Sequence, residues 1–199
     1  MAPAEYSSIL ANVAKHISLN EKETTFFIAS LKAKSLKKKE FLLKAGQPCL
    51  TINYVHEGVL RAFYQNKNGS ETTIMFAVAE WWITDMPCFI NQLPAMTSIE
   101  ALDDCTVFQL TKQDLDALYI EVPKFERFFR ILMQNSYIRE QLRTLQNLSL
   151  PAEKRYNKFL TKYPDIAKRL TQKQIASYLG ITPEFLSAIR KKISKGTIS

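Results

Sequence analysis

Apolar residues near the start of the chain recur at spacings of three and four positions. They are Tyr6, Ile9, Leu10, Val13 and Ile17. This periodicity is typical of a helix that buries one face. Residues 18–20 interrupt the pattern and residues 21–31 resume it, so we expect helices through most of residues 1–32. The basic stretch at residues 34–39 is interpreted as a solvated strand or turn edge.

From residue 40 to about residue 109, the pattern changes to short runs rich in β-branched and aromatic residues. The clearest runs are residues 51–58, 59–64, 72–76, 98–102 and 106–110. Asn68-Gly69, between the second and third runs, is a strong hairpin signal. Residues 57–58 and 103–104 mark two further turns. Several short strands at this spacing predict an antiparallel barrel or sandwich.

Two helices are predicted after these strands. Thr111 can cap a short helix over residues 111–119, and Pro123 suits the first turn of a long helix over residues 124–148. The long helix carries a heptad stripe that is apolar except for one asparagine. Its members are Phe128, Ile131, Asn135, Ile138, Leu142 and Leu145. The stripe can pack on the helix's own domain or on a second copy of the chain. We predict a homodimer, because the stripe runs further than a small barrel could cover.

The formal net charge is +8, and it is concentrated at one end of the chain. Residues 1–150 contain 16 Lys and Arg and 16 Asp and Glu, which cancel. Residues 151–199 contain 11 Lys and Arg and 3 Asp and Glu, so they carry the whole surplus. A concentrated positive field attracts a polyanion, because neutralised phosphates release counterions. A solvated or membrane-surface basic tail would have the same charge. The residue pattern within this segment must therefore distinguish such a tail from a nucleic-acid-binding segment.

One stretch of the basic segment combines the features that a helix-turn-helix requires. Thr171 and Gln174 form a capping-box pattern, which begins a helix. Gly180 permits the positive φ of a tight turn, and Thr182 followed by Pro183 begins a second helix. The inward-facing positions are apolar. They are Ile175, Ala176, Leu179, Ile181, Leu186 and Ile189. An ordinary helical hairpin with surface lysines is the alternative, and it explains fewer of these features together.

The outer face of the second predicted helix can lie against a DNA major groove. We assign base reading to Glu184, which can accept from a cytosine amine, and to Ser187. No Arg lies on the exposed first turns, where it could grip a guanine. The remaining DNA-binding candidates are expected mainly to contact phosphates, with one site at a helix N-terminus. They are Thr171, Lys173, Thr182, Arg190, Lys191 and Lys192.

Other classes of protein are disfavoured. We expect reduced, mostly buried thiols from the three widely spaced cysteines, and with only two histidines no metal-ligand spacing can be built. The chain has no run of 18 or more apolar residues and its first ten residues do not resemble a secretory signal, so we expect no membrane span and a cytoplasmic location. An enzyme ranks last, because no Ser/His/Asp constellation or phosphate-cradling glycine loop is found.

A β-rich domain, a long dimer-like helix and a terminal helix-turn-helix, in that order, resemble the Crp/Fnr family of bacterial regulators. Residues 170–187 and the strand at residues 98–102 carry the resemblance most clearly. The stretch at residues 79–85 is similar to the loop that family members place against their ligand. Its candidate ligand-binding residues are Trp81, Trp82, Thr84 and Asp85. The resemblance implies a cyclic-nucleotide-binding-like jelly roll, a homodimer, regulation by repositioning of the DNA-binding parts, and RNA polymerase as a further partner.

The chain also departs from the family pattern. Members that bind cyclic AMP carry a Gly-Glu pair in this loop for the ribose and an Arg shortly after it for the phosphate. Here the pair reads Thr84-Asp85, and residues 91–97 contain no Arg or Lys. A buried phosphate without a cation suffers a large desolvation cost, so we do not expect cyclic AMP to bind. No cofactor is predicted, and the effector stays unassigned. Large aromatics in such a loop are also commonly core residues.

Two departures concern DNA recognition. Many members carry Arg on either side of Glu184, whereas this chain has Pro183 and Ala188, so its target sequence should differ from theirs. Few residues follow Lys195, which predicts a short or missing wing after the helix-turn-helix.

We therefore predict an α+β protein: an antiparallel jelly-roll barrel with flanking helices, a long dimerisation helix and a C-terminal helix-turn-helix domain. The expected boundaries are residues 1–122, 123–149 and 150–199. The favoured function is a homodimeric regulator that binds double-stranded DNA. The alternative is a sensor or protein-interaction module whose helix-turn-helix no longer binds DNA, which Ala188 and the short C-terminus would favour.

Overall fold

The computed structural model describes residues 4–194 of the chain. Its N-terminal part is helical, as predicted. The helices are η1 (Ala4–Tyr6), α1 (Ser7–Ala14) and α2 (Glu21–Ala29). Ile9 and Val13 bury the apolar face of α1, and the side chain of Asn20 caps α2.

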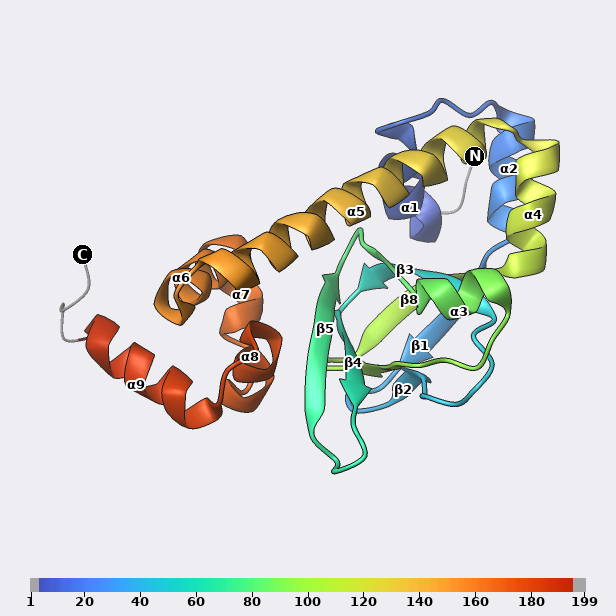
Figure 1. Cartoon of the computed structure of the whole chain (residues 1–199). Helices are drawn as coiled ribbons and strands as arrows, with labels where there is room; N and C mark the ends of the chain where they lie inside the picture. The colour runs from blue at the N-terminus through green and yellow to red at the C-terminus, as the bar shows by residue number, and fades with distance from the viewer. Residues whose placement is uncertain (1–3, 195–199) are drawn as a thin grey trace.

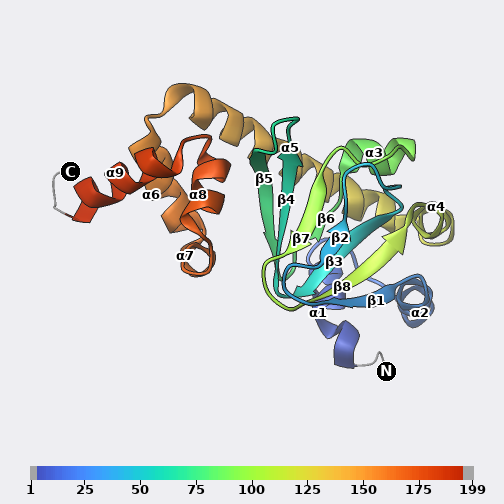
Figure 2. The ribbon, with the colours of Figure 1, turned by 90° about the horizontal axis from the view of Figure 1, so that it is seen from below.

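Eight strands follow within the described residues. They are β1 (Lys32–Leu36), β2 (Phe41–Leu43), β3 (Thr51–Glu57), β4 (Val59–Gln65), β5 (Glu71–Val78), β6 (Trp82–Ile83), β7 (Ser98–Ala101) and β8 (Cys105–Thr111). They form two antiparallel sheets in the orders β1-β8-β3-β6 and β2-β7-β4-β5, which curve around one core (Figure 2). Apart from the β4–β5 hairpin, neighbours in each order are not consecutive in the chain, as in a jelly roll. The predicted fold class is confirmed.

Gly58 and Gly69 have different roles in this region. Gly69 lies in a tight turn between the paired strands β4 and β5, which confirms the predicted hairpin. Gly58 instead lies where the chain passes from one sheet to the other, since β3 and β4 are not paired. Its φ is +93°, and a Cβ there would lie 2.4 Å from the Sγ of Cys105. Only glycine fits this crossing without strain.

Three more helices belong to the barrel domain or lead out of it. They are α3 (Met86–Asn91), α4 (Lys112–Glu121) and α5 (Lys124–Ser149). Thr111 caps α4 and Pro123 stands at the N-cap of α5, so both predicted helices are confirmed. α3 was not predicted, because six residues with Pro87 in the first turn show no helical period. The 26-residue α5 runs from the barrel to the C-terminal helices (Figure 1).

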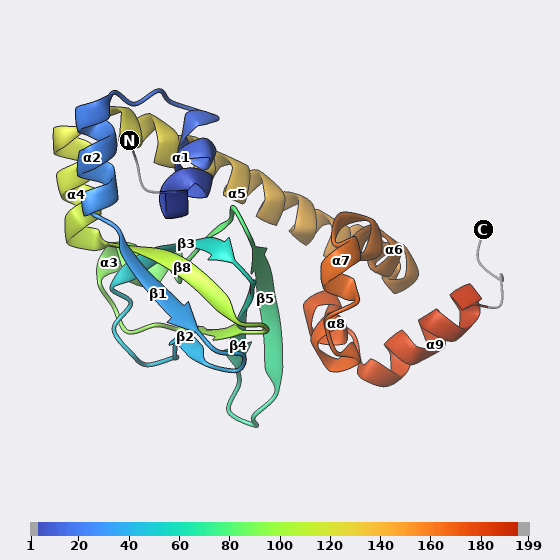
Figure 3. The same cartoon turned by 180° about the vertical axis from the view of Figure 1, so that it is seen from behind.

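Four helices form the C-terminal part, which we call the head (residues 152–194). They are α6 (Ala152–Lys162), α7 (Pro164–Ala167), α8 (Gln172–Leu179) and α9 (Pro183–Ser194). The head lies at the far end of α5 and beside β5 (Figure 3). One buried cluster joins Val59 and Phe76 of the barrel to Phe159 and Tyr163 of the head. Packing therefore crosses the predicted domain boundary at residues 149–150, and the division stays a prediction.

The sequence led us to expect no membrane-spanning helix, no metal site and reduced cysteines. Within residues 4–194, no helix combines the length and apolar character needed to cross a membrane, and no group of three or more potential ligands could hold a metal. The three cysteines are buried and unpaired, as expected. Burial raises the pKa of each thiol, so the protonated form is favoured. The predicted short or missing wing falls on residues 195–199, which lie outside the described residues.

Candidate DNA-binding head and sensor pocket

The first helix of the predicted helix-turn-helix begins and ends as the sequence indicates. Thr171 Oγ1 accepts a hydrogen bond from the Gln174 N–H at 3.2 Å, and Gln174 Oε1 accepts from the Thr171 N–H at 2.9 Å. α8 ends at Gly180, whose φ of +66° allows the turn. Ala176 is fully buried, where a larger side chain would push the neighbouring helix away.

The second helix is fixed against the first. Thr182 Oγ1 accepts from the Phe185 N–H at 3.2 Å and so caps α9. Gln172 Nε2 donates to the carbonyl oxygen of Pro183 at 2.7 Å, which ties the start of α8 to the start of α9. Leu186 of α9 is fully buried under this pair. The two helices therefore form one unit with the geometry of a helix-turn-helix.

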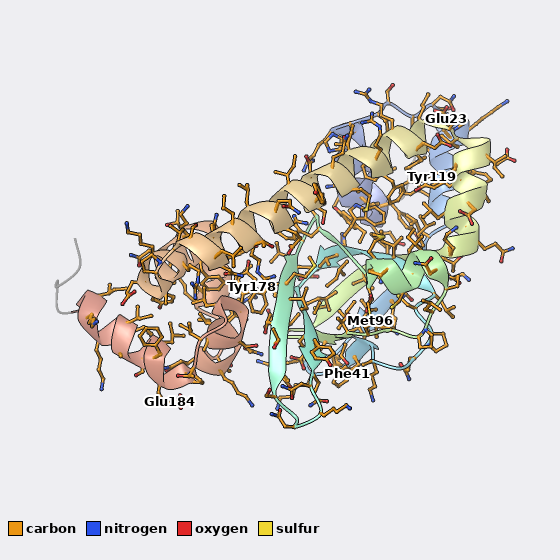
Figure 4. All side chains as sticks on the ribbon, viewed as in Figure 1. Glu23, Phe41, Met96, Tyr119, Tyr178 and Glu184 are labelled. Carbon is orange, nitrogen blue, oxygen red and sulfur yellow. The ribbon has the colours of Figure 1, made fainter. Side chains whose placement is uncertain are left out.

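The outer face of α9 is open to solvent (Figure 4, Glu184). Seven of the eight predicted DNA-binding residues are exposed. They are Thr171, Lys173, Thr182, Glu184, Arg190, Lys191 and Lys192. The eighth, Ser187, is half-buried. Within the described chain, the only carboxylate within 4.0 Å of these cations is that of Glu153, at 4.0 Å from Lys192 Nζ. This face is therefore positively charged and free for an outside partner.

Phe185 was not among the predicted DNA-binding residues. Its side chain is 46% exposed at the start of α9, next to Glu184. The sequence could have indicated its exposure, because it is a large apolar residue outside the inward-facing positions of the helix. Ala188 is also exposed on α9. The outer face thus offers methyl and ring contacts as well as charge.

Ser177 of α8 holds the head against the barrel. Its Oγ accepts from the Thr73 N–H at 2.8 Å and donates to the carbonyl oxygen of Glu71 at 2.7 Å. Thr73 Oγ1 accepts from Arg61 Nε at 2.9 Å. Arg61 is buried and its Nη1 bridges the carboxylates of Glu71 and Glu100 at 2.8 and 2.9 Å. A hydrogen-bonded chain therefore runs from the barrel into the helix-turn-helix.

Arg143 of α5 joins the same region from the other side. Its Nη2 donates to the carbonyl oxygens of Thr73 at 3.1 Å and Tyr178 at 3.3 Å, and its Nη1 donates to that of Ile74. Its guanidinium carbon lies 4.4 Å from the centre of the Tyr178 ring. Figure 4 labels Tyr178 where α5, the head and β5 meet. Contacts between residues distant in sequence thus fix the head's position.

The residues of the predicted dimer stripe become more exposed along α5. Phe128 is fully buried in the protomer's own core, so its prediction as a dimer contact is wrong. The heptad pattern continues into the core and does not reveal which surface each residue meets. Ile131 is half-buried and Asn135 is exposed. Further along, the apolar stripe is open to solvent. Its exposed apolar residues are Ile138, Leu142 and Leu145, with Leu148 beyond the predicted set.

A pocket of about 250 Å³ lies between β6 and α5. Trp81, Trp82 and Thr84, three of the four predicted ligand-binding residues, line it. Trp82 is also part of the core, because its ring meets those of Phe128 and Phe129 edge to face. The walls are otherwise mainly apolar. They include Ile52, Met75, Ile83, Met86, Leu132 and Met133.

Asp85, the fourth predicted ligand-binding residue, does not line this pocket. It is 5% exposed, and its Oδ2 accepts from the Met96 N–H, the Thr97 N–H and Thr97 Oγ1, each at 2.9 Å (Met96 in Figure 4). The carboxylate closes the loop that follows α3. The prediction for Asp85 is therefore corrected: it is a loop-closing residue.

Comparison with known proteins identifies the barrel. The family model described as the cyclic nucleotide-binding domain matches residues 33–121. The barrel segment is therefore similar to a cyclic nucleotide-binding domain. It covers β1 to the end of α4, so the predicted barrel class is confirmed.

The rest of the chain follows the same architecture as known regulators. A transcriptional regulator of the Crp/Fnr family from Eubacterium rectale has a TM-score of 0.73 at 18% identity, covering 91% of this chain and 87% of its own. The c-di-GMP-responsive global regulator of Xanthomonas campestris has a TM-score of 0.72 at 14% identity, covering 89% and 93%. These likenesses show the fold, and they confirm the resemblance to Crp/Fnr regulators.

A curated relative is similar in sequence. The anaerobic regulatory protein of Pasteurella multocida (strain Pm70) is 23% identical over 173 residues, which is 81% of this chain. The match spans 63% of the relative's length.

In the barrel segment, the backbone amides best placed for a phosphate are already engaged. The amides of Met96 and Thr97 could hold a phosphate, but they already donate to Asp85. A second anion beside this carboxylate would be repelled. The one cation that lines the pocket is Arg139, whose guanidinium carbon lies 4.5 Å from the centre of the Trp81 ring. The pocket suits an uncharged ligand better than a phosphate.

Proposed function

We propose that this protein is a transcription regulator that binds specific sequences of double-stranded DNA through α8 and α9. The observation that carries the proposal is the capped helix pair whose outer face exposes Arg190, Lys191 and Lys192. The chain is similar to a transcriptional regulator, to a global regulator that links signalling to gene expression and to an anaerobic regulatory protein, which supports the same role. Such a regulator acts on DNA in the cytoplasm, with RNA polymerase as its further partner.

The contacts divide by chemistry. Lys191, Lys192 and Arg190 supply affinity for phosphates, and Thr171 with Lys173 binds a phosphate near the start of α8. Glu184 accepts from a cytosine amine, with Ser187 beside it. Phe185 and Ala188 can contact thymine methyl groups, because these groups line the same groove. Thr182 mainly caps α9 and orients it.

The active species is a homodimer through α5. The exposed apolar residues from Ile138 to Leu148 support this, since a stripe of this size rarely remains in water. Two heads related by a two-fold axis would read half-sites about 34 Å apart.

The regulator does not respond to cyclic AMP. Asp85 occupies the loop amides, and residues 91–97 supply no cation, which together support this. An uncharged effector in the pocket beside Trp81 and Trp82 fits the apolar walls. Calorimetry with cyclic AMP is expected to show no binding, and tight binding would contradict this part of the proposal.

Selection from a random-sequence duplex library with the purified protein tests DNA binding. We expect one sequence family to be enriched, with half-sites one helical turn apart. If a dimer neutralises six or more phosphates, its affinity falls about a thousandfold between 50 and 200 mM salt. No enrichment together with a flat salt dependence would favour the alternative, a sensor whose head no longer binds DNA.

A further inference from the structure

A groove of about 340 Å³ lies between α5, α6 and the end of α8, at the joint between barrel and head. Five of its lining residues are Lys or Arg, and none is Asp or Glu. The five cations are Arg139, Arg143, Arg155, Lys158 and Lys162. We call this the basic groove. It adjoins the pocket beside Trp82, with which it shares Asn135 and Arg139, and it lies apart from the outer face of α9.

The charges in the basic groove are largely unneutralised. Only Arg143 has a carboxylate in range, with Nη1 3.7 Å from Glu140 Oε2. Among the residues that the structure describes, the other four cations have no carboxylate oxygen within 4.0 Å. Arg155 donates to the carbonyl oxygens of Leu150 and Leu179, and its buried Nε has no partner in the same set. The groove therefore offers donors and charge to a ligand.

The spacing of these residues concentrates like charge. Arg139 and Arg143 lie one turn apart on α5, and Lys158 and Lys162 lie one turn apart on α6. Like charges at this spacing destabilise a helix. Burial, followed by the charges of Arg139 and Arg143, lowers the pKa of Lys162. Arg143 and Arg155 also hold the head through backbone carbonyls, but that role does not account for Lys158 and Lys162 beside them. A ligand that relieves the repulsion explains these two lysines better.

We propose that the basic groove binds a small oligophosphate, an anion with at least two phosphate groups. The ammonium groups of Lys158 and Lys162 on one wall face the guanidinium charge of Arg139 on the other, which suits an anion with several charges. The guanidinium groups of Arg143 and Arg155 add positive charge, although their terminal nitrogens already donate to backbone carbonyls. The volume is within the range of small-molecule sites. Ile138 and Leu142 line the groove as well as the exposed stripe of α5, so the site lies at the edge of the proposed dimer contact.

The basic groove lies between the head and α5, the helix that also lines the pocket beside Trp82. A ligand that neutralises both walls would stabilise the head in its present position against α5. If the proposed DNA-binding function holds, oligophosphate would therefore change the affinity for DNA. The binding site itself does not depend on that function and is tested without DNA.

The test uses the full chain, with inorganic pyrophosphate and tripolyphosphate as probes and sodium chloride at equal ionic strength as reference. Thermal unfolding and calorimetry are measured for the wild type, for Lys158→Gln/Lys162→Gln, and for the control Lys154→Gln/Lys168→Gln. The control removes the same charge from the head outside the groove. At about one hundred times the Kd, we expect Tm to rise by roughly 5 °C or more in the wild type and control. The groove variant should lose at least tenfold in affinity.

Without ligand, the groove variant should be at least as stable as the wild type, because repulsion is relieved. A lower Tm in this variant would show a merely structural role and overturn the proposal. Equal shifts in all three proteins would show adsorption to the basic head, and no shift in the wild type would show no site. Competition by duplex DNA, with an equal loss of DNA affinity in the groove variant, would make the groove a DNA contact instead. If no DNA is bound but pyrophosphate is, only the proposed function fails.

Discussion

The charged residues of the head and Asp85 of the barrel differ in burial and in pairing. On α9, Lys191 and Arg190 are exposed and have no carboxylate within 4.0 Å among the described residues. Asp85 is buried, and three donors of the chain itself satisfy one of its oxygens. A buried charge must be satisfied inside the protein, whereas an exposed charge remains available to an outside partner. The burial and pairing of charged residues, more than their number, therefore indicate where a ligand binds.

The largest expected effect is on folding stability, at the loop that Asp85 closes. Asp85→Ala removes a buried carboxylate and leaves the amides of Met96 and Thr97 without their acceptor. We expect the free energy of unfolding to fall by about 3 kcal/mol, measured by urea denaturation. Asp165→Ala is the matched control, because Asp165 is exposed and should cost less than about 0.5 kcal/mol. Equal stability of the Asp85 variant and the wild type would show that this carboxylate does not hold the loop.

Next comes base reading by the head. Glu184→Ala should reduce discrimination at one cytosine position by about 2 kcal/mol, because the carboxylate that accepts from the amine is lost. The measurement compares the Kd for the selected duplex with that for duplexes substituted at each position. A variant that keeps the wild-type preference at every position would remove Glu184 from base recognition.

Phosphate contacts should act without regard to sequence. Lys191→Ala is expected to weaken binding to cognate and scrambled duplexes alike, by about tenfold, and to reduce the salt slope by about 1. Lys22→Ala on α2 changes the net charge equally and serves as the control. Loss of cognate binding alone would instead place Lys191 against a base.

The smallest effect concerns methyl groups. If Phe185 meets a thymine, replacing that thymine by uracil in the duplex should weaken wild-type binding by about 0.8 kcal/mol, roughly fourfold. Phe185→Ala should abolish the difference between the two duplexes. Uracil substitution that has the same effect on both proteins would assign the methyl contact to another residue.

Local signals account for what the sequence could predict. The capping box at Thr171, the turn at Gly180 and the hairpin at Gly69 each depend on neighbours within a few residues. The contact of Ser177 with Thr73 spans 104 positions and has no local signal. Phe128 was misassigned because a heptad pattern does not tell which partner covers it. The basic groove also escaped prediction, since it needs α5 and α6 side by side.

Footprinting of the selected duplex tests the central claim most directly. The account predicts two protected stretches on one face of the DNA, with centres about 34 Å apart, and weaker protection at both when Lys191 and Lys192 are replaced by alanine. Protection that is spread evenly along the duplex, or that is unchanged in this variant, would contradict DNA recognition by α9.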